Sequence, residues 1–253
     1  MPRYRGLDLC ALLAFCALCA PRVAQPTLHL SAARIEIGAF YRGTVLQADG
    51  TVPLQCQVAL ELTGERETVD FNRKGRFGPL WLNRGGVFFE GLPHLYMVAT
   101  SCGAADVEWE EALSAHGVGY AALRKGIGIR QSPPGEDSLI FDELLSLKER
   151  AGLFAFLPEK IDLIPRHSLS AGFSVRFQIP ASAPPGAYRA TLYCFSGGRL
   201  LAKTGEFLTV EKVGFTRLVT DLAFHNSALY GMVAVVAALL TGLSIGALFN
   251  RKK

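Results

Sequence analysis

The longest uninterrupted run of apolar residues lies at the C-terminal end of the chain. No charged side chain occurs between His225 and Arg251. A helix over residues 228–249 would be roughly 33 Å long at about 1.5 Å per residue, which is enough to cross a hydrocarbon core of about 30 Å. The pattern therefore predicts one transmembrane helix at residues 228–249.

Small residues form a second pattern within this predicted helix. Four of them recur at intervals of four residues, namely Ala234, Ala238, Gly242 and Gly246. Small side chains at this spacing leave a groove on one face of a helix, where a second helix can approach closely. We expect a helix–helix interface here, with either another copy of the chain or a different membrane protein as partner.

The residues after the predicted helix are basic. Residues 250–253 read Asn-Arg-Lys-Lys, and positive charge beside a membrane helix favours the cytoplasmic side. The tail is therefore predicted to be cytoplasmic, and the chain before the helix is predicted to lie on the opposite side of the membrane.

The N-terminal residues 1–25 have the layout of a secretory signal peptide. Arg3 and Arg5 form a cationic start, and a short apolar core follows at residues 9–20. A core of about twelve residues is too short to span a bilayer comfortably, which favours a cleaved signal peptide over an uncleaved signal anchor. The sequence leaves the cleavage position open.

Alternating hydrophobic and polar residues predict strands in two segments between these ends. The alternation is clearest at residues 56–63 in the segment 26–103 and at residues 173–179 in the segment 153–214. Short strands separated by Gly and Pro are typical of β-sandwiches. We therefore predict a mainly β fold with two sandwich-like lobes.

A proline-rich turn in the second segment narrows this prediction. Ile179-Pro180 is followed by a Pro-Pro-Gly turn and then by Tyr188. This layout is common in immunoglobulin-like modules, where the strand after the turn packs its tyrosine inward. We expect the sandwich to be immunoglobulin-like.

The spacing of apolar residues changes from that of strands to that of helices in the middle of the chain, at residues 104–152. Residues 137–150 carry acidic residues in the first turns and Lys148 and Arg150 in the last, and Gly152 follows. An apolar stripe runs along this segment through Ile140, Phe141, Leu144, Leu145 and Leu147. We predict a helical insertion between the two lobes, and a juxtamembrane linker at residues 215–227.

The net positive charge of the chain comes from its two ends. The formal net charge is +4, of which the C-terminal tail contributes +3 and the first 24 residues contribute +2. The remaining segment is left with a formal charge of −1, which does not indicate a nucleic-acid surface.

Three cysteines lie outside the predicted signal peptide: Cys56, Cys102 and Cys194. An odd number in an oxidising compartment permits one disulfide and leaves one thiol. We expect Cys56 to pair with Cys102. The alternative is that all three are small buried hydrophobic residues.

The search for catalytic or metal-binding motifs gives little. His94, Met97 and Cys102 are soft ligands within nine residues, as Cu(I) prefers. On a strand, however, His94 and Met97 would point to opposite faces. No cofactor or metal site is therefore predicted.

A cationic turn could bind an anion. Arg73, Lys74 and Arg76 are grouped in one predicted turn, where guanidinium groups could bind an oxyanion such as sulfite or sulfonate. The alternative is a solvated hairpin tip.

Several segments resemble one protein family. They are residues 70–78, 81–83, 87–93 and 96–100 in the first half, and residues 179–193, 210–215 and 229–231 in the second. These segments are similar to a family of bacterial single-span transmembrane proteins that is best represented in alphaproteobacteria. The resemblance implies a single-pass inner-membrane protein with a periplasmic N-terminal domain, and it implies no catalytic residues.

Members of that family tend to be encoded beside a multi-span permease of the sulfite/sulfonate exporter type. The resemblance thus implies a membrane-anchored periplasmic accessory or binding protein at such a transporter, and we expect no enzymatic activity. A self-associating structural or sensing protein of the cell envelope is the alternative. A thiol- or metal-dependent enzyme is less favoured, since no catalytic motif is found.

Overall fold

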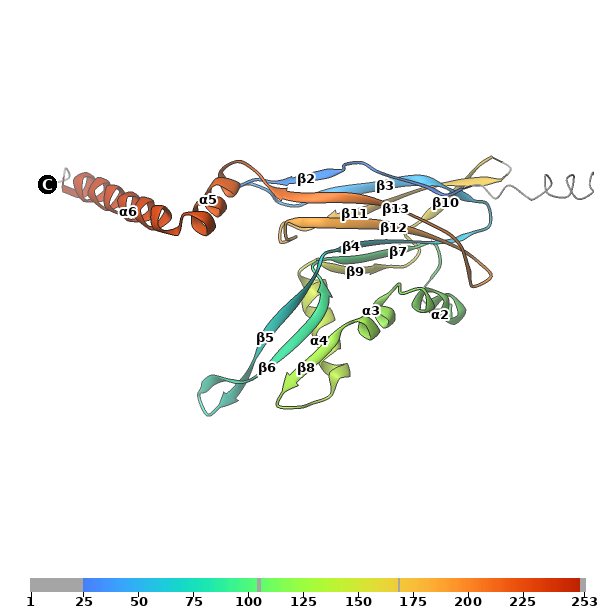
Figure 1. The fold of residues 1–253 in the computed structure, drawn as a ribbon, viewed down its shortest axis with the longest axis horizontal. Coiled ribbons are helices and arrows are strands. Elements are labelled where there is room, and N and C mark those ends of the chain that lie inside the picture. The colour runs from blue at the N-terminus through green and yellow to red at the C-terminus, as the bar shows by residue number, and fades with distance from the viewer. Residues whose placement is uncertain (1–24, 104–105, 168, 251–253) are drawn as a thin grey trace, which may run out of the picture.

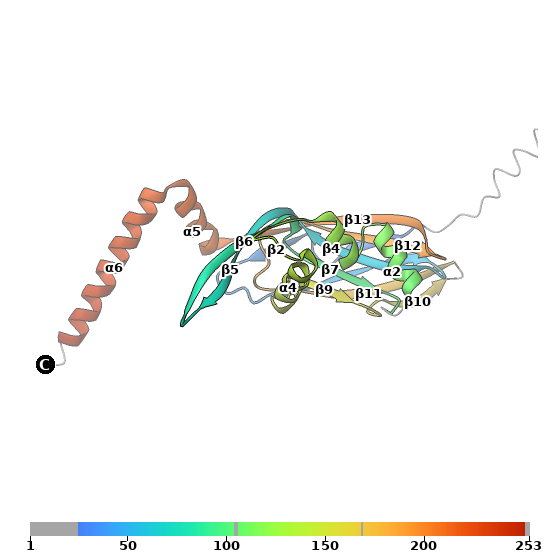
Figure 2. The same ribbon diagram turned by 90° about the horizontal axis from the view of Figure 1, so that it is seen from below.

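The structure is a computed structural model that describes residues 25–103, 106–167 and 169–250. It has an elongated β-rich body, and two helices leave one end of that body (Figures 1 and 2). The signal peptide predicted at residues 1–25, apart from Gln25, and the three basic residues 251–253 lie outside the described residues.

Two sheets form a sandwich. The four-stranded sheet is antiparallel throughout, in the order β1 (Thr27–Leu30), β3 (Thr44–Pro53), β11 (Ser170–Ile179) and β10 (Asp162–His167). The six-stranded sheet has the order β2 (Arg34–Ile37), β13 (Arg199–Lys212), β12 (Gly186–Ser196), β4 (Gln57–Gly64), β7 (Tyr96–Thr100) and β9 (Phe154–Leu157). Its outermost pairs, β2–β13 and β7–β9, are parallel.

A third layer covers the other face of the six-stranded sheet. It contains the antiparallel strands β5 (Arg66–Phe77), β6 (Leu80–Pro93) and β8 (Gly128–Ser132). It also contains the helices α2 (Val107–Ala115), α3 (Tyr120–Gly126) and α4 (Asp137–Arg150). In Figure 1 the layer lies below the sandwich, and the β5–β6 hairpin projects from it as an arm.

The six-stranded sheet is therefore buried on both faces. Leu60 and Leu62 on β4 pack in the core between the two sheets, whereas Ala59 on the same strand packs in the core beneath the third layer. β4 is buried at five consecutive positions, as is typical of a strand covered on both sides. By contrast, β11 alternates buried and exposed side chains after residue 173, because only one of its faces is covered.

The expectation of a mainly β sandwich with a helical insertion is confirmed, and so is that of one C-terminal apolar helix. The helix predicted at residues 137–150 is α4 with the same bounds. Tyr188 is 2% exposed, and its hydroxyl donates a hydrogen bond of 2.5 Å to the carbonyl of Pro184. The tyrosine after the proline-rich turn thus packs inward, as expected.

The two predicted lobes are not separate. β3 from the first segment pairs with β11 from the second, and β4 pairs with β12. Strands from residues 26–103 and 153–214 thus share both sheets, because alternation along a strand does not identify its neighbours. The insertion at residues 104–152 accordingly packs on a face of the sheet and does not separate two lobes.

The membrane-proximal segment is helical. Residues 215–227, expected to be a linker, lie mostly in α5 (Gly214–His225), and α6 (Ser227–Asn250) follows. An apolar window from Ser227 to Ala247 has a mean hydropathy of 2.1, and none of it is buried against the body. By length and composition, α6 is a candidate membrane span.

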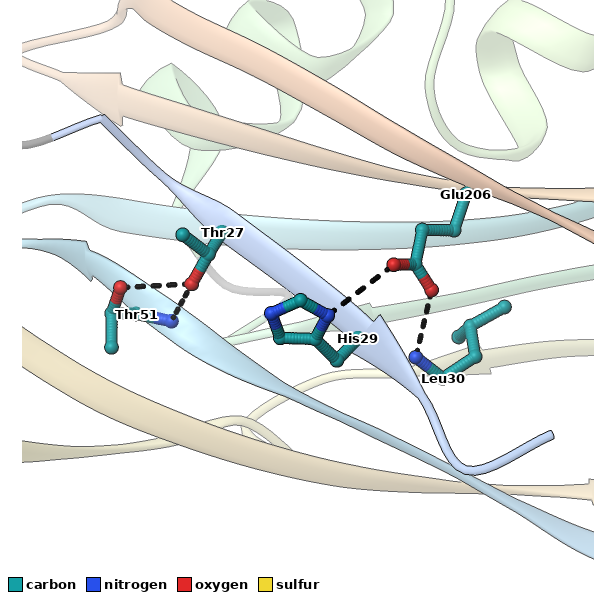
Figure 3. A network of polar contacts seen from close by, with 5 residues as sticks. All are labelled: Thr27, His29, Leu30, Thr51 and Glu206. Carbon is teal, nitrogen blue, oxygen red and sulfur yellow. Dashed lines mark hydrogen bonds and ion pairs between the residues drawn. The ribbon is translucent and has the colours of Figure 1, made fainter. Parts of the chain in front are cut away.

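One edge of the sandwich is closed by a polar clamp between the sheets (Figure 3). Glu206 on β13 accepts a 2.9 Å hydrogen bond from the backbone N–H of Leu30 on β1. The same carboxylate lies 3.4 Å from Nδ1 of His29. Thr27 and Thr51, joined through their hydroxyls at 2.9 Å, link β1 to β3 beside it.

Candidate functional site

The opposite edge of the sandwich is open, and a cavity lies along it. β9 is the last strand of the six-stranded sheet and pairs only with β7. In the other sheet, β10 pairs with β11 only up to Asp162 opposite Ser174. The remaining residues of β11, from Val175 to Ile179, pair with β3 alone. Two unpaired strand edges therefore face this side of the body.

A groove of about 690 Å³ lies between these edges. We call it the edge groove. Its floor is apolar, with buried Met97 and Val175 together with partly buried Ala155 and Leu157, all of which pack in or against the core between the two sheets. Exposed backbone edges beside apolar side chains are the features that bind an extended polypeptide in strand addition.

The rim of the edge groove is polar and mostly cationic. Lys160 and Arg176 line it, are exposed, and form no ion pair with any described residue. Glu149 also lines it, but its carboxylate already accepts a 2.8 Å hydrogen bond from the hydroxyl of Tyr120. The rim therefore carries two cations and one carboxylate, which leaves an excess of one positive charge.

The cations of the predicted anion site do not converge. Arg73 and Lys74 on β5 line a smaller cavity of about 380 Å³, and Glu143 of α4 lines the same cavity. Arg76 is not among the residues that line it; its Nε donates a 3.1 Å hydrogen bond to the carbonyl of Gly78 at the hairpin turn. Two of the three predicted cations thus share a cavity with a carboxylate, and the third lies apart from it, so the anion contact stays a prediction.

The candidate metal ligands are also dispersed. Nε2 of His94 lies 2.9 Å from a carboxylate oxygen of Glu67, whereas the side chain of Met97 packs in the core between the two sheets. Cys102 packs against the core on the other side of the six-stranded sheet. Among the described residues, no group of three His, Cys, Asp or Glu side chains could hold a metal ion.

The three cysteines are free thiols in the structure, so the pairing of Cys56 with Cys102 is not observed. Cys56 lies in the core between the two sheets, and Cys102 borders the core on the opposite side of the six-stranded sheet. Cys194 shares the core of Cys56. Burial, with a smaller effect of the nearby Cys56, raises the pKa of Cys194 to about 12. A thiol with so high a pKa is a poor nucleophile at neutral pH.

The small residues of α6 are accessible. A Cβ atom added to Gly242 or Gly246 would meet no described atom within 4 Å outside the helix itself. The stripe formed by Ala234, Ala238, Gly242 and Gly246 therefore makes no contact with the body that would prevent another helix from packing on it. The helix–helix interface stays a prediction.

The family of the chain follows from its sequence match. Residues 27–251 match the model of a family described as "Putative transmembrane protein (Alph_Pro_TM)". The chain belongs to this family. The match includes the body as well as α5 and α6, and it confirms the resemblance found in the sequence.

Other comparisons add little. No curated protein sequence matches the chain. Among solved structures, murine CRIg is similar over 76% of this chain and 100% of that chain, with 8% identity and a TM-score of 0.25. The bacterial superantigen toxic shock syndrome toxin-1 is similar over 74% of this chain and 99% of that chain, with 6% identity and a TM-score of 0.22. A family 123 glycoside hydrolase from Clostridium perfringens covers 76% of this chain and 28% of its own, with 8% identity and a TM-score of 0.23.

Sequence reasoning missed one polar cluster in this family member. Glu61 on β4 is only 8% exposed, and its carboxylate accepts a 3.0 Å hydrogen bond from the hydroxyl of Tyr193. Burial raises the pKa of Glu61, although the hydrogen bonds from Tyr193 and Tyr96 oppose that shift. In the sequence Glu61 occupies a polar position of an alternating strand and looks solvent-facing. It is buried because the third layer covers that face.

Proposed function

We propose that the protein is a membrane-anchored accessory protein that binds an integral membrane partner through its edge groove. The single observation that supports this function best is the pair of unpaired strand edges, β9 and residues 175–179 of β11, that flank an apolar groove of about 690 Å³. The family assignment and the candidate span in the described part of the chain support the choice of a partner in or at a membrane.

The occupant we propose is an extended segment of the partner. A strand that adds to β9 or to β11 gains main-chain hydrogen bonds from the free edge, and its alternate side chains enter the groove. The apolar floor at Met97, Val175 and Leu157 suits aliphatic or aromatic side chains. Lys160 and Arg176 on the rim favour a segment that carries at least one carboxylate.

The transmembrane contact is the second part of the proposal. The Ala234–Gly246 stripe, as defined above, permits close approach of a partner helix in the bilayer. Arg251, Lys252 and Lys253 favour a cytoplasmic C-terminus, so the body and its edge groove would face the periplasm across the bacterial inner membrane. The family resemblance suggests a permease of the sulfite/sulfonate exporter type as the partner, and we expect no enzymatic activity.

Photocrosslinking from native membranes tests this proposal. A photoreactive amino acid at position 155, on the floor of the edge groove, is expected to form a covalent adduct with a multi-span membrane protein. Mass spectrometry of the adduct identifies that protein and the segment that is linked. Lys160→Glu with Arg176→Glu is expected to reduce the adduct at least several-fold, because both rim charges are reversed.

A helix variant tests the second contact with a matched control. Gly242→Ile with Gly246→Ile fills the stripe and is expected to abolish co-purification of the partner. Ala237→Ile with Ala247→Ile adds the same side chain on other faces of the helix and is expected to preserve it. Adducts with another copy of the chain alone would overturn the accessory function and favour self-association. The accessory function would also be overturned if the partner were captured equally well by the rim variant Lys160→Glu/Arg176→Glu and by the helix variant Gly242→Ile/Gly246→Ile.

A further inference from the structure

We propose that the tip of the β5–β6 hairpin contacts anionic lipid headgroups of the membrane in which α6 is anchored. We call residues 73–83 the arm tip. This inference depends on α6 spanning a membrane, and it does not depend on the occupant of the edge groove.

The register of the sheet places the arm at the membrane-proximal end of the body. Gly64, the last residue of β4, lies opposite Tyr188 on β12, and Tyr188 lies opposite Leu208 on β13. β13 ends four residues later at Lys212, and α5 begins at Gly214. The arm and α5 therefore leave the same end of the six-stranded sheet.

The two views of the molecule agree with this register. In Figure 1 the arm extends from the body toward the side where α5 and α6 lie. In Figure 2, seen from below, the arm again points toward that side. A hairpin that projects beyond the sheet at this end can reach the surface of the membrane that α6 enters.

The arm tip exposes apolar side chains. Leu80 is 61% exposed and Leu82 is 49% exposed, although both lie within a strand. They are two residues apart on β6, so they point to the same side of the hairpin. In water this exposure brings no stabilisation, whereas at a lipid interface the same side chains would be removed from water.

Cations accompany these apolar residues. Arg73, Lys74 and Arg76 are all exposed, and none forms an ion pair with a described residue. The acidic groups near them are Asp70 on the same strand and Glu143 across the smaller cavity, so the excess charge at the tip is positive. In the register of the hairpin, Leu80 and Leu82 lie opposite Phe77 and Gly75, whereas Lys74 and Arg76 alternate onto the other face. A tip that meets the membrane end-on presents both faces to the headgroups, and basic residues together with exposed aliphatic ones bind anionic lipid surfaces.

α5 is consistent with a position at the membrane surface. It is amphipathic, with Arg217 and Asp221 paired at 3.6 Å one turn apart. Leu218 is 64% exposed and Phe224 is 83% exposed on this helix. The arm tip and α5 thus present apolar and charged groups at the same end of the protein.

Because the protein is anchored by α6, a weak contact is enough to keep the arm tip on the lipid surface. Because α6 holds the body at the bilayer, the arm tip meets lipids as an intramolecular partner at high effective concentration. Arm and anchor together would limit the tilt of the body relative to the membrane.

Fluorescence quenching on the full chain tests the proposal. The protein is reconstituted in lipid nanodiscs of phosphatidylcholine with about one third phosphatidylglycerol, an environment-sensitive fluorophore is attached at Leu80→Cys, and doxyl-labelled lipids serve as the quencher. The background carries Cys102→Ser, because Cys102 is the most exposed of the three described cysteines. The matched control label is at Leu201→Cys, which is also half-exposed but lies near the start of β13, about 36 Å from Lys212 at 3.3 Å per residue.

We expect blue-shifted emission and several-fold stronger quenching at position 80 than at position 201. The difference is expected to fall at least twofold in Arg73→Glu/Lys74→Glu/Arg76→Glu and in discs of phosphatidylcholine alone. Arg73→Lys with Arg76→Lys is expected to retain it, which separates lost charge from a misfolded arm. Equal quenching at the two positions would overturn the proposal. So would quenching at position 80 that changes neither with the charge reversal nor with the charge of the lipids.

Discussion

The carboxylate of Glu206 on β13 lies 2.9 Å from the backbone nitrogen of Leu30 on β1 and accepts its hydrogen bond. This contact joins β1, an edge strand of the four-stranded sheet, to β13, the second strand of the six-stranded sheet. Removing it in Glu206→Ala is expected to lower the free energy of unfolding by about 1 kcal/mol, because the N–H of Leu30 loses its acceptor at a half-buried site. Urea denaturation of the full chain in detergent measures the change.

His29→Ala is the comparison for this prediction. His29 contacts the same carboxylate at 3.4 Å, but its side chain is 76% exposed. Its loss is expected to cost under about 0.5 kcal/mol. A larger loss in His29→Ala than in Glu206→Ala would contradict the importance of the hydrogen bond to Leu30.

Gly50 on β3 lies where β1 and β11 approach it closely. A Cβ atom at this position would be 1.9 Å from the carbonyl oxygen of Thr27 and 2.7 Å from Cε1 of Phe173. Gly50→Ala therefore requires backbone movement and is expected to destabilise the protein by about 3 kcal/mol. Gly38→Ala, where nothing lies within 4 Å, is expected to change stability by no more than about 0.5 kcal/mol. Similar melting temperatures for the two variants would refute the prediction.

Glu61 gives a dependence of stability on pH. Burial raises its pKa above the usual value of 4.5, so the folded state holds this proton to higher pH than the unfolded state does. The stabilising contribution of the protonated form is complete below pH 4.5 and is lost as the pH rises through the folded-state pKa. Glu61→Gln is therefore expected to be more stable than the natural protein at pH 7.5.

The measurement is a series of urea titrations of the natural protein and Glu61→Gln between pH 4.5 and 7.5. The stability difference is expected to shrink as the pH falls, because protonated Glu61 resembles glutamine in charge. Glu110→Gln on the exposed face of α2 serves as the matched control. If the stability difference between Glu61→Gln and the natural protein were the same at every pH, the protonation of Glu61 would not be coupled to folding.

Cysteine accessibility gives a chemical prediction. With a pKa of about 12, only about one Cys194 thiol in ten thousand is ionised at pH 8. Iodoacetamide is therefore expected to modify the partly exposed Cys102 first, while buried Cys56 and Cys194 react only after denaturation. Mass spectrometry of tryptic peptides gives the order. Recovery of a Cys56–Cys102 linked peptide from unreduced protein would contradict the three free thiols.

The sequence was most informative where one physical requirement dominates. A bilayer demands an unbroken apolar helix, so α6 could be predicted to within one residue at each end. The apolar stripe and end charges of residues 137–150 likewise predicted α4. The turn at Gly197 and Gly198 illustrates another such requirement, since both residues adopt positive φ angles, 55° and 72°, that suit glycine in a two-residue hairpin.

Long-range pairing could not be predicted in the same way. The alternation of residues 173–179 shows that one face of β11 is buried, yet it does not show that β3, more than 120 residues earlier, is the neighbour. The edge groove was missed for the same reason, since it exists only because β10 begins at Asp162, opposite Ser174, and leaves the rest of β11 unpaired on that side. The burial of Glu61 was missed because the layer that covers it comes from distant segments.

The pairing of β13 has a mechanical consequence. β13 leads directly into α5 and α6, and it lies between β2, which runs parallel to it, and β12, which runs antiparallel. A pull on the transmembrane helix therefore acts along β13 and loads both ladders of hydrogen bonds in shear, so that many bonds must yield together. The first strands of the chain thus help the last strand to resist force that arrives from the bilayer.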